Sequence, residues 1–151
     1  QATTGTFATS TAKLRIFNSL ATNGWSVSLS PTAGPTAYWN RSDNLAKYDF
    51  NDSGGDGTDS GIDADSLGGQ LSVNPSTGSV SSSCSTTGTS LGASANFIEG
   101  TTNTITLFTA SSGVPLGCNY DFTGASLTQT IPAQQPAGTY TIDMTATVVA
   151  L

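Results

Sequence analysis

The last part of the sequence alternates strictly between apolar and polar residues, and this pattern restricts the fold more than any other feature. From position 140 to position 148, every second residue is apolar or aromatic, and the residues between them are threonine or aspartate. Successive side chains of a β-strand point to opposite faces, so this alternation predicts a strand with one buried face. The face predicted to be buried carries Tyr140, Ile142, Met144, Ala146 and Val148.

Shorter runs of the same kind recur earlier in the chain, and no segment shows a helical period over a useful length. Two of them follow the N-terminal stretch, with apolar positions at Ala12, Leu14, Ile16, and then at Trp25, Val27 and Leu29. The sequence therefore predicts an all-β fold, a single-domain β-sandwich of jelly-roll or Ig-like type with about eight or nine strands. We assign residues 1–10 to an N-terminal arm and residues 11–151 to the sandwich.

Charge excludes two classes of partner. The chain has four basic and ten acidic residues and a net charge of −6. Binding to nucleic acid or to an anionic membrane requires clustered positive charge that neutralises phosphate. The sequence offers no such cluster, so we expect neither partner.

The cysteine content indicates an oxidising compartment. Cys84 and Cys118 are the only cysteines, and the chain has no histidine. One pair in an acidic, Ser/Thr-rich chain predicts a disulfide and an extracellular or cell-surface location; two free buried thiols are the alternative. No apolar run approaches the length of a membrane span, so no transmembrane segment is expected. The start at Gln1 fits a mature chain from which a signal peptide has been removed.

An acidic, glycine-rich stretch lies between Asp49 and Asp65 and holds six of the ten acidic residues. Oxygen-bearing side chains alternate at its start, and a glycine follows at the sixth position, as in the first half of a calcium-binding loop. Carboxylate and carbonyl oxygens without His or Cys favour Ca²⁺ over zinc or copper. The alternative is a solvated acidic loop. The predicted Ca²⁺ ligands are Asp49, Asn51, Ser53, Asp59, Asp63 and Asp65.

The sequence lacks the usual catalytic sets. Without histidine, and with its two cysteines predicted to pair, it has no common nucleophile and base. Glu99 and Asp121 lie near aromatic residues outside the acidic stretch, but no pattern places these carboxylates together for glycosidase chemistry. We therefore predict that the protein is not an enzyme and has no catalytic residues.

Four aromatic residues, Trp25, Tyr38, Trp39 and Tyr48, are candidates for a platform that binds sugar rings. Trp25 lies on the apolar face of its predicted strand and is expected in the core. Tyr38 and Trp39 lie beside proline and polar residues, so one of them is expected at the surface; Tyr48 precedes the acidic stretch.

Two segments resemble bacterial surface proteins. The first is NGWSVSLS from Asn23 to Ser30, and the second is PAGTYTIDMTATV from Pro136 to Val148. WxL-type cell-surface domains have a similar Gly-Trp strand and a similar closing strand, and spore-coat-U-like and fimbrial subunits share the closing pattern. The final strand lacks the Trp of the second WxL motif. The resemblance implies a secreted, non-enzymatic β-sandwich that serves as a pilus or filament subunit.

These features together predict a structural subunit of an extracellular filament, pilus or surface layer, assembled from copies of itself by β-strand addition. The arm Gln1–Ser10 would be the donor strand, with a frayed terminus as the alternative. The expected acceptor groove is lined by Leu14, Ile16, Tyr140, Ile142 and Met144. The alternative function is a calcium-dependent carbohydrate-binding or adhesin module, with surface glycans as partners.

Overall fold

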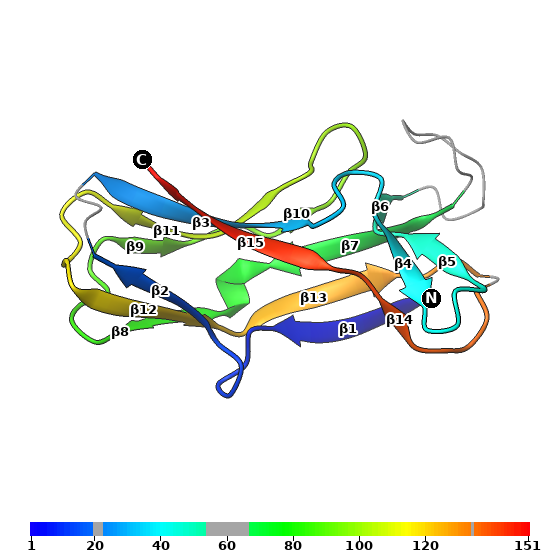
Figure 1. Ribbon diagram of the computed structural model, residues 1–151, viewed down its shortest axis with the longest axis horizontal. Coiled ribbons are helices and arrows are strands. Elements are labelled where there is room, and N and C mark those ends of the chain that lie inside the picture. The colour runs from blue at the N-terminus through cyan, green and yellow to red at the C-terminus, as the bar shows by residue number, and fades with distance from the viewer. Residues whose placement is uncertain (20–22, 54–66, 134) are drawn as a thin grey trace.

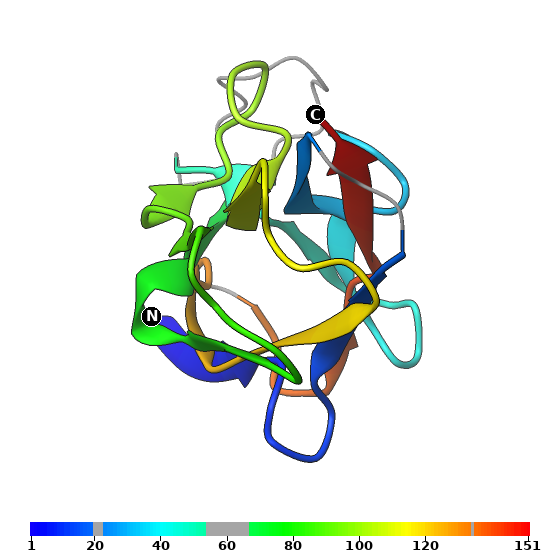
Figure 2. The same cartoon turned by 90° about the vertical axis from the view of Figure 1, so that its left-hand side faces the viewer.

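The computed structural model describes residues 1–19, 23–53, 67–133 and 135–151 (Figures 1 and 2). This part of the chain forms fifteen strands and one short 3-10 turn, so the predicted all-β class is confirmed. The elements are β1 (Ala2–Phe7), β2 (Leu14–Asn18), β3 (Gly24–Pro31), β4 (Tyr38–Arg41), β5 (Lys47–Asp49), β6 (Asn51–Asp52), β7 (Gly69–Asn74), η1 (Pro75–Thr77), β8 (Ser79–Ser82), β9 (Thr89–Leu91), β10 (Ala95–Asn96), β11 (Ile105–Ser111), β12 (Cys118–Thr123), β13 (Ala125–Thr130), β14 (Tyr140–Thr141) and β15 (Met144–Ala150).

The strands are more numerous than the eight or nine expected, because some alternating stretches change partner part-way. The closing alternation forms two strands, β14 and β15, separated by Ile142 and Asp143. β14 pairs with β4, whereas β15 pairs with β3. A period of two specifies which residues share a face, but it carries no information on the neighbouring strand.

The described strands form four sheets whose pairs are all antiparallel. The largest has the order β1-β13-β7-β10, with β6 also on β7, and a second has the order β15-β3-β11-β9. Two smaller sheets have the orders β2-β12-β8 and β14-β4-β5. In Figure 1, the sheet of β2, β12 and β8 continues the sheet of β1, β13 and β7 toward one end of the molecule. The strands β3, β11 and β15 lie across from them (Figure 2).

The chain bends at two neighbouring points, after β1 and between β12 and β13, where the sheet of β1 and β13 passes into the sheet of β2 and β12. Gly124 separates β12 from β13 with φ of 88°, and Ala8 follows β1 with φ of 58°. The Gly124 N–H donates a hydrogen bond to the Ala8 carbonyl at 2.6 Å. Left-handed backbone is easy for glycine, but it costs alanine roughly 1–2 kcal/mol. Ala8 is therefore a strained residue at the junction of β1 and β2.

A cluster of buried apolar side chains lies between the sheets. Trp25 is in this core, as predicted, with its ring edge-on to Phe108 and Tyr120 at centroid distances of 5.3 Å. Phe108 joins Leu107 inside because the register of β11 against β3 shifts between Thr106 and Phe108, which turns two successive side chains inward. The larger core residues are Trp25, Val27, Leu29, Phe50, Leu71, Val73, Phe97, Ile105, Leu107, Phe108, Tyr120 and Phe122.

Within the described ranges, no helix has the length and apolar character needed to cross a membrane.

Candidate functional site

Residues 49–53, the part of the acidic stretch that the structure describes, lie largely in strands and not in a loop. Asp49 ends β5 and Asn51 begins β6, and each is only 1% exposed. The Asp49 Oδ1 accepts a hydrogen bond from the Phe50 N–H at 2.9 Å, and the Asn51 Nδ2 donates to the Pro35 carbonyl at 2.9 Å. The Asn51 Oδ1 is buried without a hydrogen-bond partner among the described residues.

The calcium prediction is only partly covered by the structure. Of the predicted ligands, Asp49 and Asn51 are buried and Ser53 is exposed. Asp59, Asp63 and Asp65 lie outside the described residues. Across the part of the chain that is described, no three Asp, Glu, Cys or His side chains come together as a metal site. Calcium binding at the stretch therefore stays a prediction.

Asp121 has a structural role. Its carboxylate accepts hydrogen bonds from Arg15 Nε at 2.6 Å and Nη2 at 2.8 Å, and it lies 2.7 Å from Lys13 Nζ. The hydrogen bond from Arg15 holds the pKa of Asp121 well below its usual range, against the opposing effect of burial, and Lys13 acts in the same direction as Arg15. Arg15 and Asp121 are partners in the β2–β12 register, so the contact ties these two strands together.

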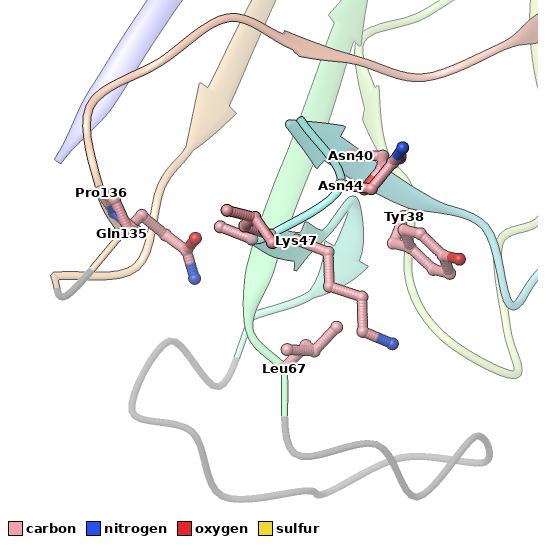
Figure 3. Close-up of a pocket in the computed structure, with 9 residues that line it drawn as sticks. Tyr38, Asn40, Asn44, Lys47, Leu67, Gln135 and Pro136 are labelled. Carbon is pink, nitrogen blue, oxygen red and sulfur yellow. The ribbon is translucent and has the colours of Figure 1, made fainter. Parts of the chain in front are cut away.

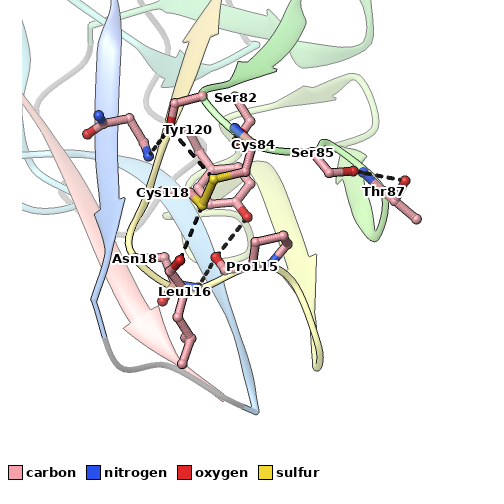
Figure 4. The surroundings of a disulfide bond; sticks show 11 residues. Asn18, Ser82, Cys84, Ser85, Thr87, Pro115, Leu116, Cys118 and Tyr120 are labelled. Carbon is pink, nitrogen blue, oxygen red and sulfur yellow. Dashed lines mark hydrogen bonds between the residues drawn. A yellow bond between two sulfur atoms is a disulfide. The ribbon is translucent and has the colours of Figure 1, made fainter.

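The disulfide predicted from the two cysteines is present (Figure 4). It joins Cys84, just after β8, to Cys118 at the start of β12, across 34 residues. Cys118 is buried. Nearby, the Tyr120 hydroxyl and the Asn18 Nδ2 both donate to the Pro115 carbonyl, at 3.1 and 3.3 Å. The crosslink therefore ties the β8–β9 connection to a well-bonded end of the sheet β2-β12-β8.

One of the two adjacent aromatic residues in β4 lies at the surface and the other packs inward. Tyr38 is 41% exposed, whereas Trp39 is half-buried and its Nε1 donates to Gln129 Oε1 at 2.8 Å. The Trp39 ring stacks on Tyr48 at 6.0 Å, and Tyr48 packs against Tyr140 at 4.9 Å. Burial, together with Tyr140, raises the pKa of Tyr48 to about 12, so this hydroxyl stays neutral. Tyr38 is thus the aromatic residue of this group that a ligand can reach.

Two pockets flank Tyr38. The larger has a volume of about 560 Å³, and its lining residues, drawn in Figure 3, include Asn40, Asn44, Lys47 and Gln135. The smaller has about 270 Å³ and shares both Tyr38 and Asn40 with the first. The larger pocket forms where β4, β5 and the segment before β14 meet, and the smaller one where the β3–β4 connection and β4 meet β14 and the residues after it. The sequence predicts neither pocket, because each combines segments that are distant along the chain.

The N-terminal arm pairs with its own chain. β1 lies antiparallel to β13 from Ala2 opposite Thr130 to Phe7 opposite Ala125. Most of its side chains are exposed, and only Phe7 packs against the core. The sequence predicts instead that the arm of one copy enters a groove of a neighbouring copy, lined by Leu14, Ile16, Tyr140, Ile142 and Met144. The structure puts the arm on the edge of β13 because the β1–β2 junction bends there.

The closing strand β15 is far more exposed than its alternation predicts. Met144 is half-buried, but every following residue of β15 is exposed, and Val148 is 46% exposed. β15 is the terminal strand of its sheet. A small pocket of about 150 Å³ separates the ends of β2 and β15, over Trp25. Of the face predicted to be buried, Tyr140, Ile142 and Met144 are therefore partly covered, whereas Ala146 and Val148 are exposed.

Comparison with known protein families, with curated proteins and with solved structures found no significant match.

Proposed function

We propose that this protein is a secreted structural subunit that assembles with copies of itself, by β-strand addition, into an extracellular filament or surface layer. One observation carries the proposal. β1 is attached to the rest of the molecule by main-chain pairing with β13, while its side chains are mostly exposed. Such pairing depends little on side chains, so the β1 of a second copy fits the same edge. Exchange of an identical element replaces each contact with an equal one, which makes it a low-cost route to assembly.

Two of the four terminal strands of the larger sheets, β1 and β15, support self-association. Proteins that avoid edge-to-edge pairing usually place Lys, Pro or a bulge on their edge strands. β1 (ATTGTF) and β15 (MTATVVA) contain no charged residue and no proline. β2, by contrast, has Arg15 on its edge and Lys13 just before it. The strands at the opposite ends of these sheets, β9 and β10, are only three and two residues long, and a short edge strand offers little for pairing. β1 and β15 are therefore the long edges of the larger sheets that lack such protection.

Other features are consistent with this role. The buried side chains between the sheets form one cluster, which supports a single β-sandwich after the arm. The Cys84–Cys118 disulfide supports an oxidising, extracellular compartment. The resemblance of the closing strand to fimbrial subunits favours the same assignment. Calcium bound in the acidic stretch would add stability to the subunit, and no catalytic role is proposed.

A pair of cysteines across β1 and β13 tests the exchange. Thr4 and Thr128 face each other in the register, so Thr4→Cys/Thr128→Cys forms a disulfide within the closed monomer. We expect the oxidised monomer to stay monomeric by light scattering, because its β1 is tied to its own β13. The reduced variant should assemble, and oxidation after assembly should give a covalent ladder on a non-reducing gel.

A matched pair on β3 and β15 serves as the control. Ser28 and Thr147 also face each other, and Ser28→Cys/Thr147→Cys ties β15 to its neighbour without restraining β1. This variant should assemble in both redox states and give no ladder. If the oxidised Thr4→Cys/Thr128→Cys monomer assembles as well as the reduced one, exchange of β1 is wrong. If the wild-type protein stays monomeric at every concentration, the filament proposal itself is wrong.

A further inference from the structure

We propose that the two pockets flanking Tyr38 form a binding site for a neutral saccharide, with the Tyr38 ring between two sugar units. This site is separate from the β1–β13 edge and does not depend on strand exchange. Ligand sites are concave and hold a few convergent polar groups beside aromatic or apolar surface. The larger pocket, at about 560 Å³, falls within the size range typical of small-molecule sites.

The exposed Tyr38 ring supplies the apolar surface. It belongs to the walls of both pockets, together with Asn40. The Lys47 Nζ lies 4.5 Å from the Tyr38 ring centroid, and both side chains line the larger pocket (Figure 3). A sugar presents C–H groups on the faces of its ring and hydroxyls at its rim. An exposed aromatic ring with polar neighbours matches that combination.

Carboxamides and hydroxyls supply the polar groups. The Asn40 Nδ2 donates to the Asn44 Oδ1, which leaves the Asn40 Oδ1 as an acceptor and the Asn44 Nδ2 as a donor. The Gln135 Oε1 accepts from the Tyr140 hydroxyl at 3.4 Å, so its Nε2 is left to donate. Around the smaller pocket, Thr141 and Asp143 add a hydroxyl and a carboxylate. Donors and acceptors are thus mixed, as a ligand rich in hydroxyl groups requires.

The charge balance favours a neutral sugar over an acidic one. Asp143 borders the smaller pocket, and the chain as a whole carries a net charge of −6. Among the described residues that line the larger pocket, Lys47 is the only cation, and its ammonium group lies over Tyr38. A carboxylated saccharide would therefore meet a repulsive field with one nearby positive charge.

Binding of defined oligosaccharides to the full chain tests the site. The probes are cellohexaose, xylohexaose, mannohexaose and maltohexaose, with polygalacturonate as the acidic comparison, each measured by titration calorimetry. We expect at least one neutral probe to bind. Tyr38→Ala should weaken that binding about tenfold, whereas Tyr38→Phe, which keeps the ring, should change it by no more than about twofold.

Two further variants separate a ligand contact from a structural role. Asn44 has a left-handed φ of 61°, so Asn44→Gly keeps the turn and removes only the amide. It should weaken binding about fivefold through the lost hydrogen bond. Phe17→Ala removes a ring that is 58% exposed but borders neither pocket, and it should leave binding unchanged. Urea midpoints of all variants check that each is folded.

Three results would overturn the proposal: no binding of any neutral probe, binding of polygalacturonate alone, or equal affinity of Tyr38→Ala and the wild type. None of them bears on assembly through β1.

Discussion

Replacing Ala8 by glycine should make the closed monomer more stable relative to the assembled form. Ala8 lies between β1 and β2 with φ of 58°, a conformation that costs alanine roughly 1–2 kcal/mol and glycine very little. If β1 moves to a neighbour, residues 8–13 straighten and this strain is released. The strain therefore favours exchange, and Ala8→Gly should lower the exchange constant by roughly 5- to 30-fold.

The measurement is the fraction of protein in assemblies, followed by size-exclusion chromatography with light scattering over a range of concentrations. At the concentration where half of the wild type is assembled, Ala8→Gly should be largely monomeric. Ala12→Gly is the matched control, because Ala12 is an exposed alanine of the same connection without a positive φ. It adds the same chain flexibility without relieving strain, so its assembly should stay close to that of the wild type.

Two outcomes would refute this reasoning. If Ala8→Gly assembles as readily as the wild type, strain at Ala8 does not contribute to exchange. If Ala12→Gly reduces assembly as much as Ala8→Gly does, loop flexibility is the cause and the strain argument is wrong.

Three further predictions concern stability. Removing the disulfide with Cys84→Ser/Cys118→Ala should lower the free energy of unfolding by about 3.8 kcal/mol, because the crosslink spans 34 residues and restricts the unfolded chain. Urea titrations measure this loss, and a loss under about 1 kcal/mol would contradict the chain-entropy argument. The pKa of Asp121 is depressed in the folded state, so its contribution is present above the unfolded pKa of about 3.9 and is lost as the pH falls toward the folded pKa. Asp121→Asn should therefore lower the urea midpoint of unfolding at pH 7, and this midpoint should fall less than that of the wild type as the pH drops below about 4. If the urea midpoints of variant and wild type change in parallel with pH, the ion pair does not stabilise the fold. Calcium at 100 times its Kd should add about 2.7 kcal/mol, seen as a higher melting temperature than in EGTA, and an unchanged temperature would favour the solvated acidic loop.

Side-chain patterns in the sequence were sufficient for the fold class and for part of the core. Trp25, Val27 and Leu29 alternate with serines, and all three are buried in β3 as predicted. A β-strand places alternate side chains on one face, whatever its neighbours are, so this inference is local. The Cys84–Cys118 pairing was also predictable, because a chain with two cysteines has one possible intramolecular disulfide.

The aromatic and acidic residues show where local patterns stop being sufficient. Tyr38 and Trp39 are neighbours in one strand, and the sequence indicated only that one of them is exposed. Trp39 turns inward because Gln129, 90 residues away, accepts its N–H. The sequence predicts Asp49 in an acidic loop, yet this residue is buried at the end of β5, where its main-chain carbonyl accepts a hydrogen bond from the Gln129 side chain.

The alternating residues 140–148, which restrict the fold most, also separate what the sequence determines from what only tertiary structure decides. By itself, the sequence determined that residues 140–148 form extended structure with two distinct faces. Tertiary structure decided that the stretch divides between β4 and β3, and that the face of β15 carrying Val148 remains exposed at a sheet edge. It also decided that β1 lies on β13. Strand pairing and coverage are set by contacts between residues distant in sequence, and a period of two contains no information on which strand comes next.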